Sequence, residues 1–172
     1  DEFVRAWTVR MVTDSGKLEA EVAKLASQLA AKDASIEVRK QLASSAKRMP
    51  AEFALPTIAA LLTRDEDAVD IHQPLLIWWA LEKNIAGVDV SQLIQAILSG
   101  ERTWHRPLVS GTILERWMKR YAMTGRREDL MSAAKLLAAA PDRDSSEILL
   151  KGFEEAFQGR SLASIPDAMA AA

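Results

Sequence analysis

Four acidic residues between two predicted helices form the densest group of candidate metal ligands. They are Asp65, Glu66, Asp67 and Asp70. Clustered carboxylates are ligands that a hard cation such as calcium prefers. The spacing departs from the EF-hand loop, because Val69 stands at the fifth position and Leu76 where the bidentate glutamate is needed. The alternatives are a solvated turn, whose acids favour the start of the next helix, and an interaction surface.

The two histidines, His72 and His105, are the second candidate for metal chemistry. They fall near the starts of two predicted first helices about one repeat apart, so stacking in adjacent layers would allow a shared site. Two histidines without a third ligand are more typical of side chains that bind a local carboxylate or backbone group. We therefore predict no metal site.

Aromatic residues offer a possible binding surface. Adjacent residues on a helix point about 100° apart, so Trp78 and Trp79 cannot face the same way. We expect both in the core, because large aromatics dominate packing. The alternative places one of them on a neighbouring repeat or on a concave face. The other two tryptophans considered with them are Trp104 and Trp117.

Five cations surround one predicted helix end and the following turn. The negative end of the helix dipole favours cations there, and an anionic face of another domain is the functional alternative. The five are Arg116, Lys119, Arg120, Arg126 and Arg127, of which the first three join the acidic run as a possible interaction surface.

Recognisable catalytic signatures are missing from the sequence. It contains no Gly-x-Gly-x-x-Gly, phosphate-binding loop, Gly-x-Ser-x-Gly or His-Glu-x-x-His motif. With no cysteine, the chain has no disulfide, thiolate metal site or covalent haem attachment. We predict a non-catalytic segment with no cofactor of its own.

The elements that must position these residues are helices. Ala and Leu are abundant, while Gly and Pro number only 7 and 6 among 172 residues. Apolar residues recur at helical spacing between short breaks. Two pairs, Asp89 with Gln92 and Asp144 with Glu147, fit capping boxes at helix starts. The predicted helices are Lys17–Ala31, Ala51–Thr63, Asp89–Leu98, Thr112–Met123, Glu128–Ala139 and one that opens at Asp144.

A repeat of helix–turn–helix units is visible. Val4-Arg5 recurs as Val38-Arg39, 34 positions later, and each pair opens a first helix that precedes an Ala/Leu-rich second helix. Further first helices are expected near Ile71, Arg102 to Pro107, and Ser145. Such a period indicates an α-solenoid. We expect Arg5 and Arg39 to bind turn carbonyls or acids and to fix the stacking.

The Val-Arg pairs resemble the opening of HEAT repeats. The resemblance implies a right-handed, all-α solenoid of about nine helices, with residues 1–172 as one domain whose concave face is the default contact surface. Longer strings resemble the helical region of large bacterial secreted proteins described as membrane-bound dehydrogenase-type or haem-binding. The strings are Phe3–Arg10, Val38–Ser44, Arg64–Ala68 with Asp70–Ala80, and Leu150–Arg160 closing at Pro166.

In that family a β-propeller precedes the helical region and a cytochrome c domain follows it. The resemblance implies an extracytoplasmic scaffold that links the domains of a larger redox protein, with any haem outside this segment. The start without Met fits such a piece, and no apolar run reaches the roughly 18 residues of a membrane span.

Two other functions remain open. One is a free-standing module that binds a protein or peptide. The other is a helical-repeat enzyme similar to the alkylpurine DNA glycosylases. The net charge of −2 argues against the second and against nucleic acid as a partner, because such proteins usually carry a basic excess.

Overall fold

The computed structural model describes residues 1–15 and 18–159, and within these ranges every regular element is a helix. The predicted all-α class is confirmed. The ends of the last quoted string, Arg160 and Pro166, lie outside the described residues. The α-helices are α1 (Glu2–Thr13), α2 (Ala20–Lys32), α3 (Ile36–Ala46), α4 (Ala51–Leu61), α5 (Gln73–Ile85), α6 (Val90–Ile97), α7 (Glu101–Trp104), α8 (Leu114–Thr124), α9 (Arg127–Ala138) and α10 (Arg143–Ala156).

Two short helices of other types complete the described chain. A 3-10 helix, η1 (Asp65–Val69), occupies the acidic run, and a π-helix, η2 (Val109–Ile113), leads into α8.

The chain divides into two compact units, Asp1–Val88 and Asp89 onward. The interpretation of residues 1–172 as one domain stays a prediction.

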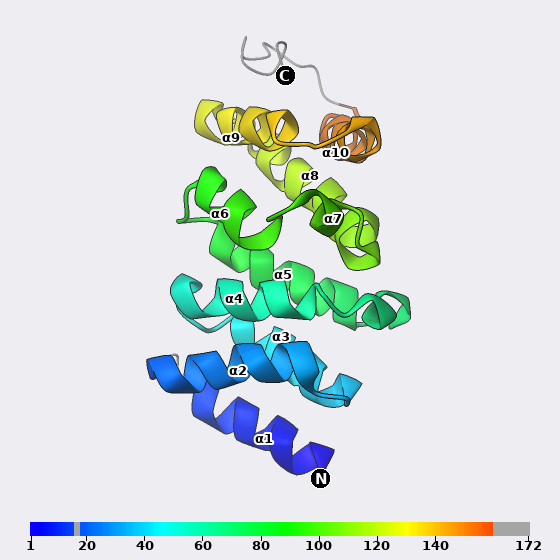
Figure 1. The fold of residues 1–172 in the computed structure, drawn as a ribbon. Coiled ribbons are helices and arrows are strands. Elements are labelled where there is room, and N and C mark those ends of the chain that lie inside the picture. Colours follow the sequence, from blue (N-terminus) through cyan, green and yellow to red (C-terminus); the bar gives the residue numbers. More distant parts are fainter. Residues whose placement is uncertain (16–17, 160–172) are drawn as a thin grey trace. The chain divides into compact units, whose positions relative to one another are not determined.

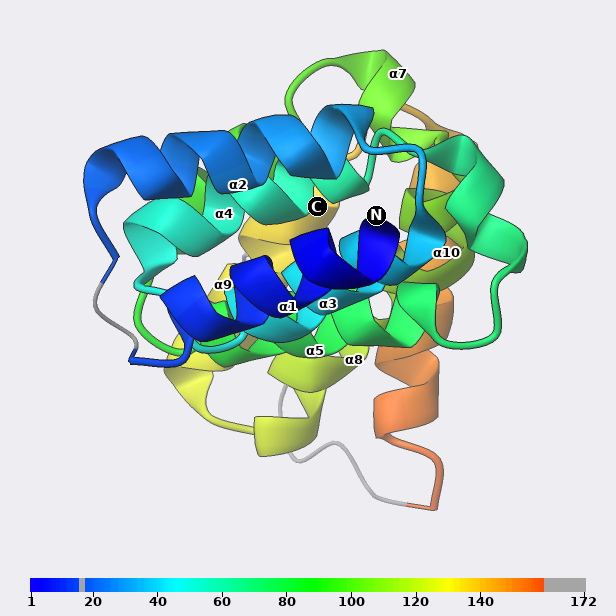
Figure 2. The ribbon, with the colours of Figure 1, turned by 90° about the horizontal axis from the view of Figure 1, so that it is seen from below.

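The first unit has two layers of helices. α1, α3 and α5 contact one another in that order, while α2 contacts α4 in the second layer (Figures 1 and 2). Ser35 Oγ donates to Glu2 Oε2 at 2.5 Å, near the starts of α1 and α3. Thr13 Oγ1 donates to Ser45 Oγ at 2.8 Å, near their ends. The first-layer helices α1 and α3 therefore run parallel.

The core of the first unit is small and aliphatic. Side chains with at most 1% exposure come from both layers, and most of them are alanine, leucine, isoleucine or valine. Pro74 lies in the first turn of α5, where its missing N–H costs no hydrogen bond. The fully buried aliphatic side chains of this unit include Val38, Leu42, Ile58, Leu61, Leu62, Ile77 and Leu81.

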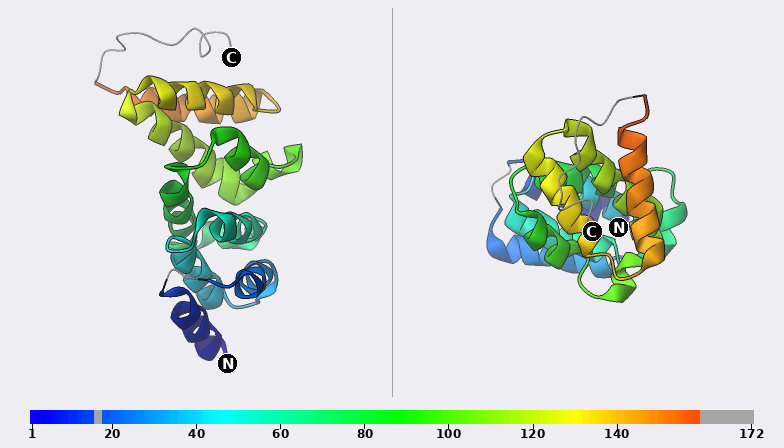
Figure 3. Two further views of the ribbon diagram at one scale, coloured as in Figure 1. Left: turned by 90° about the vertical axis from the view of Figure 1, so that its left-hand side faces the viewer. Right: turned by 90° about the horizontal axis from the view of Figure 1, so that it is seen from above.

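The second unit is centred on α8, which packs against both α9 and α10 (Figure 3). A Cβ added at Gly152 of α10 would lie 2.1 Å from the backbone oxygen of Glu115. Glycine thus lets the two helices approach closely. Two ion pairs flank this contact, Lys119 with Glu155 at 3.0 Å and Lys151 with Glu115 at 2.7 Å.

Of the two predicted helix caps, the structure confirms one and corrects the other. The capping box of Asp144 and Glu147 is wrong, because Asp142 is the N-cap of α10 and accepts from Ser145 N at 2.8 Å. Asp89 caps α6 as predicted, through Ser91 N. None of the described helices is long and apolar enough to cross a membrane.

Candidate functional site

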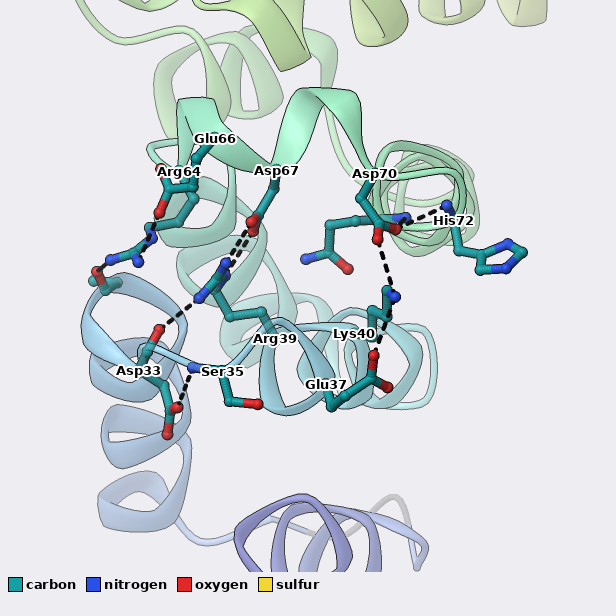
Figure 4. Close-up of polar contacts among 12 residues, drawn as sticks. Asp33, Ser35, Glu37, Arg39, Lys40, Arg64, Glu66, Asp67, Asp70 and His72 are labelled. Carbon is teal, nitrogen blue, oxygen red and sulfur yellow. Dashed lines mark hydrogen bonds and ion pairs between the residues drawn. The ribbon is translucent and has the colours of Figure 1, made fainter. Parts of the chain in front are cut away.

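Three of the four carboxylates of the acidic run pair with cations, two of them with residues of α3 (Figure 4). Asp67, 2% exposed, accepts from Arg39 Nε at 2.6 Å and from Arg39 Nη2. Asp70 pairs with Lys40 at 3.0 Å, and Glu66 pairs with Arg64 at 2.7 Å. Asp67 therefore belongs to a buried ion pair rather than to the surface on which the sequence placed it.

Arg39 joins two successive turns. Besides its two bonds to Asp67, its Nη1 donates to the backbone oxygen of Asp33 at 2.7 Å (Figure 4). One repeat earlier, Arg5 grips the Asp33 carboxylate in the same way, with Nε–Oδ2 and Nη2–Oδ1 distances of 2.7 and 2.9 Å. These contacts are of the kind predicted for the Val-Arg arginines. They form a ladder of bidentate pairs along one edge of the unit.

Hydrogen bonds lower the pKa of two carboxylates on this edge, Asp70 and Asp33. Partial burial alone would raise the pKa of Asp70, but the backbone N–H groups of Gln73 and His72 and the Lys40 ammonium hold it at about 2. The Arg5 guanidinium, opposed by desolvation and aided by the Ser35 N–H, lowers the pKa of Asp33. Carboxylates already saturated in this way have little capacity left for a cation.

Neither histidine has the surroundings of a metal ligand. His72 precedes α5, and its backbone N–H donates to Asp70 Oδ1 at 2.9 Å. In the second unit, His105 Nε2 lies 2.9 Å from Asp142 Oδ2, on the carboxylate that caps α10. Over the described ranges, no three His, Cys, Asp or Glu side chains are grouped to hold a metal ion.

The tryptophans separate into buried and exposed side chains. Trp104 and Trp117 lie in the core at 3% and 0% exposure, and Trp78 is buried at 7%. The expectation that Trp79 is also a core residue is wrong. It is 47% exposed, whereas Trp78 and Ala80 on either side of it in the sequence are buried. Neighbours on a helix point about 100° apart, so one of them can face the core while the next faces solvent.

Trp7, which the sequence analysis did not single out, is 60% exposed on α1. The Arg10 guanidinium carbon lies 5.2 Å from its ring centroid, a cation–π contact. A signal for Trp7 exists in the repeat, because the equivalent position 34 residues later is the polar Gln41. Polar residues also stand at buried repeat positions, such as Ser45 and Gln73, so this signal alone does not decide the exposure of Trp7.

A groove of about 280 Å³ runs between α1 and α3 beside this tryptophan. Phe3, Trp7 and Arg10 form its α1 side. Arg10, Ser44 and Trp79 stand at equivalent positions of the three first-layer helices, at offsets of 34 and 35 residues. We call this surface the docking face: Phe3, Trp7 and Arg10 of α1, Lys40, Gln41 and Ser44 of α3, and Trp79 of α5.

The docking face has the chemistry of a protein contact rather than of an active site. It combines three large exposed aromatics, Phe3, Trp7 and Trp79, with a polar strip from α3. Within the strip, Lys40 contacts Glu37 at 3.2 Å as well as Asp70, so its charge is held in place. Exposed tryptophans beside arginine are typical centres of protein–protein interfaces.

The basic cluster divides into two parts in the second unit. On α8, Lys119 pairs with Glu155 of α10, and Arg116 Nη1 donates to the backbone oxygen of Thr112 at 3.4 Å. At the start of α9, Arg126 pairs with Asp129 at 2.8 Å. Arg120, the third residue of the predicted surface, is half-buried on α8. Much of the positive charge is thus compensated locally.

Comparisons of the chain with protein-family models, with curated proteins and with solved structures found no match. The site must therefore be interpreted from its own geometry.

Proposed function

We propose that the chain is a HEAT-like helical-repeat scaffold that docks another protein domain on the docking face. The single observation that carries this proposal is the exposure of Trp7 and Trp79, at 60% and 47%, on two helices of one layer. The repeat register places Trp79 in line with Arg10, which contacts Trp7. Exposed aromatics of this size are costly to leave in water, and they supply most of the binding energy where they are covered.

The ladder of arginine–aspartate pairs supports a scaffold role. Arg39 ties η1 to the turn between α2 and α3, and Arg5 ties that turn to α1. Each bond fixes one repeat against the next, so the first-layer helices hold the docking face as a rigid surface. A preorganised surface loses less conformational entropy on binding.

The nature of the partner follows from the sequence resemblance alone. We propose a domain of a larger extracytoplasmic redox protein, with the chain as a non-catalytic connector and any c-type haem in another domain. The chain holds no cysteine for covalent haem attachment. The alternative, a free-standing module that binds a separate protein, uses the same face.

A site-specific photo-cross-linker tests the docking face in the native host. It is placed at position 7 or 79, and at position 25 as the control, because Leu25 is a 57% exposed apolar residue on α2 in the other layer. We expect one protein to be captured from positions 7 and 79 and not from 25. Equal capture from all three positions would contradict the proposal.

The captured partner is then purified, and its affinity is measured by calorimetry. Trp7→Ala or Trp79→Ala should weaken binding at least about tenfold, and Leu25→Ala less than about twofold. Cross-links within one polypeptide indicate the connector, and cross-links to a separate protein indicate the free-standing module. A Soret absorbance band on the partner supports the redox setting.

A further inference from the structure

The side of α1 that faces away from α3 is exposed and largely apolar. We call it the end face and define it by Val4, Thr8, Met11 and Val12. Val4, Met11 and Val12 are 64%, 72% and 43% exposed. α1 stands at one end of the first-layer series α1, α3, α5 (Figure 1). The end face is distinct from the docking face, which lies over the groove toward α3.

The equivalent positions of the other first-layer helices, α3 and α5, show what covers such a face within the repeat. Adding 34 to the end-face positions gives the matching residues of α3, and a further 35 gives those of α5. All eight matching residues are 0% exposed, and in each case the preceding first-layer helix contacts the helix that carries them. They are Val38, Leu42, Ser45 and Ala46 in α3, and Gln73, Ile77, Ala80 and Leu81 in α5.

Arg5 supplies an independent indication. It repeats both bonds of Arg39 to an aspartate 28 residues later. Arg39 also donates from Nη1 to a turn carbonyl six residues earlier, that of Asp33. Among the described residues no such carbonyl meets Arg5 Nη1, and the Arg5 side chain is 42% exposed against 4% for Arg39. By the repeat register, a matching carbonyl six residues before Arg5 would precede Asp1.

A second copy of the chain fits this face less well. Symmetric packing of two end faces would set the helices either antiparallel, with Asp1 of one copy near Asp14 of the other, or parallel, with the two Asp1 residues near each other. Both arrangements bring like charges together. Antiparallel packing would also bring no turn carbonyl to Arg5.

We propose that the end face of α1 takes a further helix pair of this repeat pattern, joined directly ahead of Asp1. Its first helix runs parallel to α1 and presents a stripe of small apolar residues, as α1 presents Ala6 and Val9 to α3. Its trailing turn brings a backbone carbonyl to Arg5 Nη1. This continues the α1–α3 and α3–α5 interfaces by one step and does not depend on the docking face.

The chain itself provides the test segment. A copy of residues 35–68 fused directly ahead of Asp1 keeps the 34-residue register, so the copied Asp67 carbonyl stands six residues before Arg5. The readout is peroxide oxidation of Met11, followed by mass spectrometry, with Met123 as the internal reference because it is 49% exposed in the second unit. Helix content and melting temperature are followed by circular dichroism.

In the fused chain we expect Met11 to be oxidised at least about fivefold more slowly and Met123 at an unchanged rate. The melting temperature should rise by several degrees, as stacked repeats gain from each new interface. Two matched fusions should lose this protection: one with two glycines inserted before Asp1, which shifts the register, and one carrying Val4→Glu.

Three results would overturn the proposal. The first is unchanged Met11 oxidation in the fused chain, whether or not the added segment becomes helical, because the end face is expected to order it. The second is equal protection in the shifted and in-register fusions. The third is a dimer of the unfused chain, detected by sedimentation, in which Met11 is already protected. None of these results changes cross-linking from positions 7 and 79, so the proposed function is judged separately.

Discussion

Arg39 and Asp67 form a bidentate ion pair across 28 residues of sequence, with both side chains at most 4% exposed. Arg5 and Asp33 form the same pair at the same separation, but Arg5 is 42% exposed. The two pairs share their chemistry and differ in burial. This difference makes them a matched set for measuring how much the ladder contributes to the stability of the fold.

Arg39→Met should lower the free energy of unfolding by about 3–5 kcal/mol, because it leaves the Asp67 carboxylate buried without a partner. Arg5→Met should cost less, because the Arg5 guanidinium is already 42% exposed. The Asp33 carboxylate, itself only 4% exposed, also keeps its hydrogen bond from the Ser35 N–H. Urea denaturation followed by circular dichroism measures both. The double variant Arg39→Met with Asp67→Leu should recover most of the loss. Equal losses at Arg5 and Arg39 would show that burial does not govern the ladder.

Asp70 should make stability depend on acid pH. Its pKa is about 2 in the folded chain, below the ordinary value near 3.9. A depressed pKa means that the stabilisation is present above the unfolded value and is lost as pH falls from about 4 toward 2. Asp70→Asn keeps a capping oxygen for α5 and removes this titration.

Chemical denaturation at several pH values between about 2 and 7 tests the role of Asp70. The wild-type chain should lose more stability over this interval than Asp70→Asn does. At pH 7 the variant should be less stable by about 1 kcal/mol, because it loses the partly exposed ion pair with Lys40 but keeps the capping oxygen. If the free energy of unfolding falls equally with pH in the two proteins, Asp70 does not contribute to the loss of stability in acid.

The helices could be predicted because leucine and alanine recur at helical spacing, and the ladder because Val-Arg recurs at one period. The partner of each arginine could not, since several acids lie in each turn and only the fold selects Asp33 and Asp67. The exposure of individual side chains could not be predicted from the sequence either. Val4 and Val38 occupy the same repeat position, but one is 64% exposed and the other 0%, because only α3 has a first-layer neighbour on that side.

The two adjacent tryptophans of α5 should respond differently to truncation. Trp78→Ala removes a side chain that is 7% exposed and should destabilise the chain by about 3–5 kcal/mol. Trp79→Ala removes a 47% exposed ring and should cost less than about 1 kcal/mol. Thermal unfolding monitored by circular dichroism compares them. Similar losses would place Trp79 in the core, as the sequence alone suggested, and would remove it from the docking face.

Gly152 should tolerate substitution less well than Gly111, a glycine of another helical segment whose surroundings are open. A Cβ at this position would meet the backbone oxygen of Glu115 at 2.1 Å, and a backbone atom cannot move aside without shifting α8 or α10. Gly152→Ala should therefore destabilise the chain by about 1–3 kcal/mol, the range of overpacked cores. Thermal and urea unfolding would measure the loss.

Gly111 is the matched control for Gly152. It also lies in a helical segment, at η2, and a Cβ there meets no atom within 4 Å. Gly111→Ala should be neutral or should stabilise by up to about 1 kcal/mol, because alanine restricts the unfolded chain more than glycine does. If Gly152→Ala were as harmless as Gly111→Ala, then α8 and α10 could separate at little cost. In that event the flanking pairs Lys119–Glu155 and Lys151–Glu115, rather than the close backbone approach, would set their spacing.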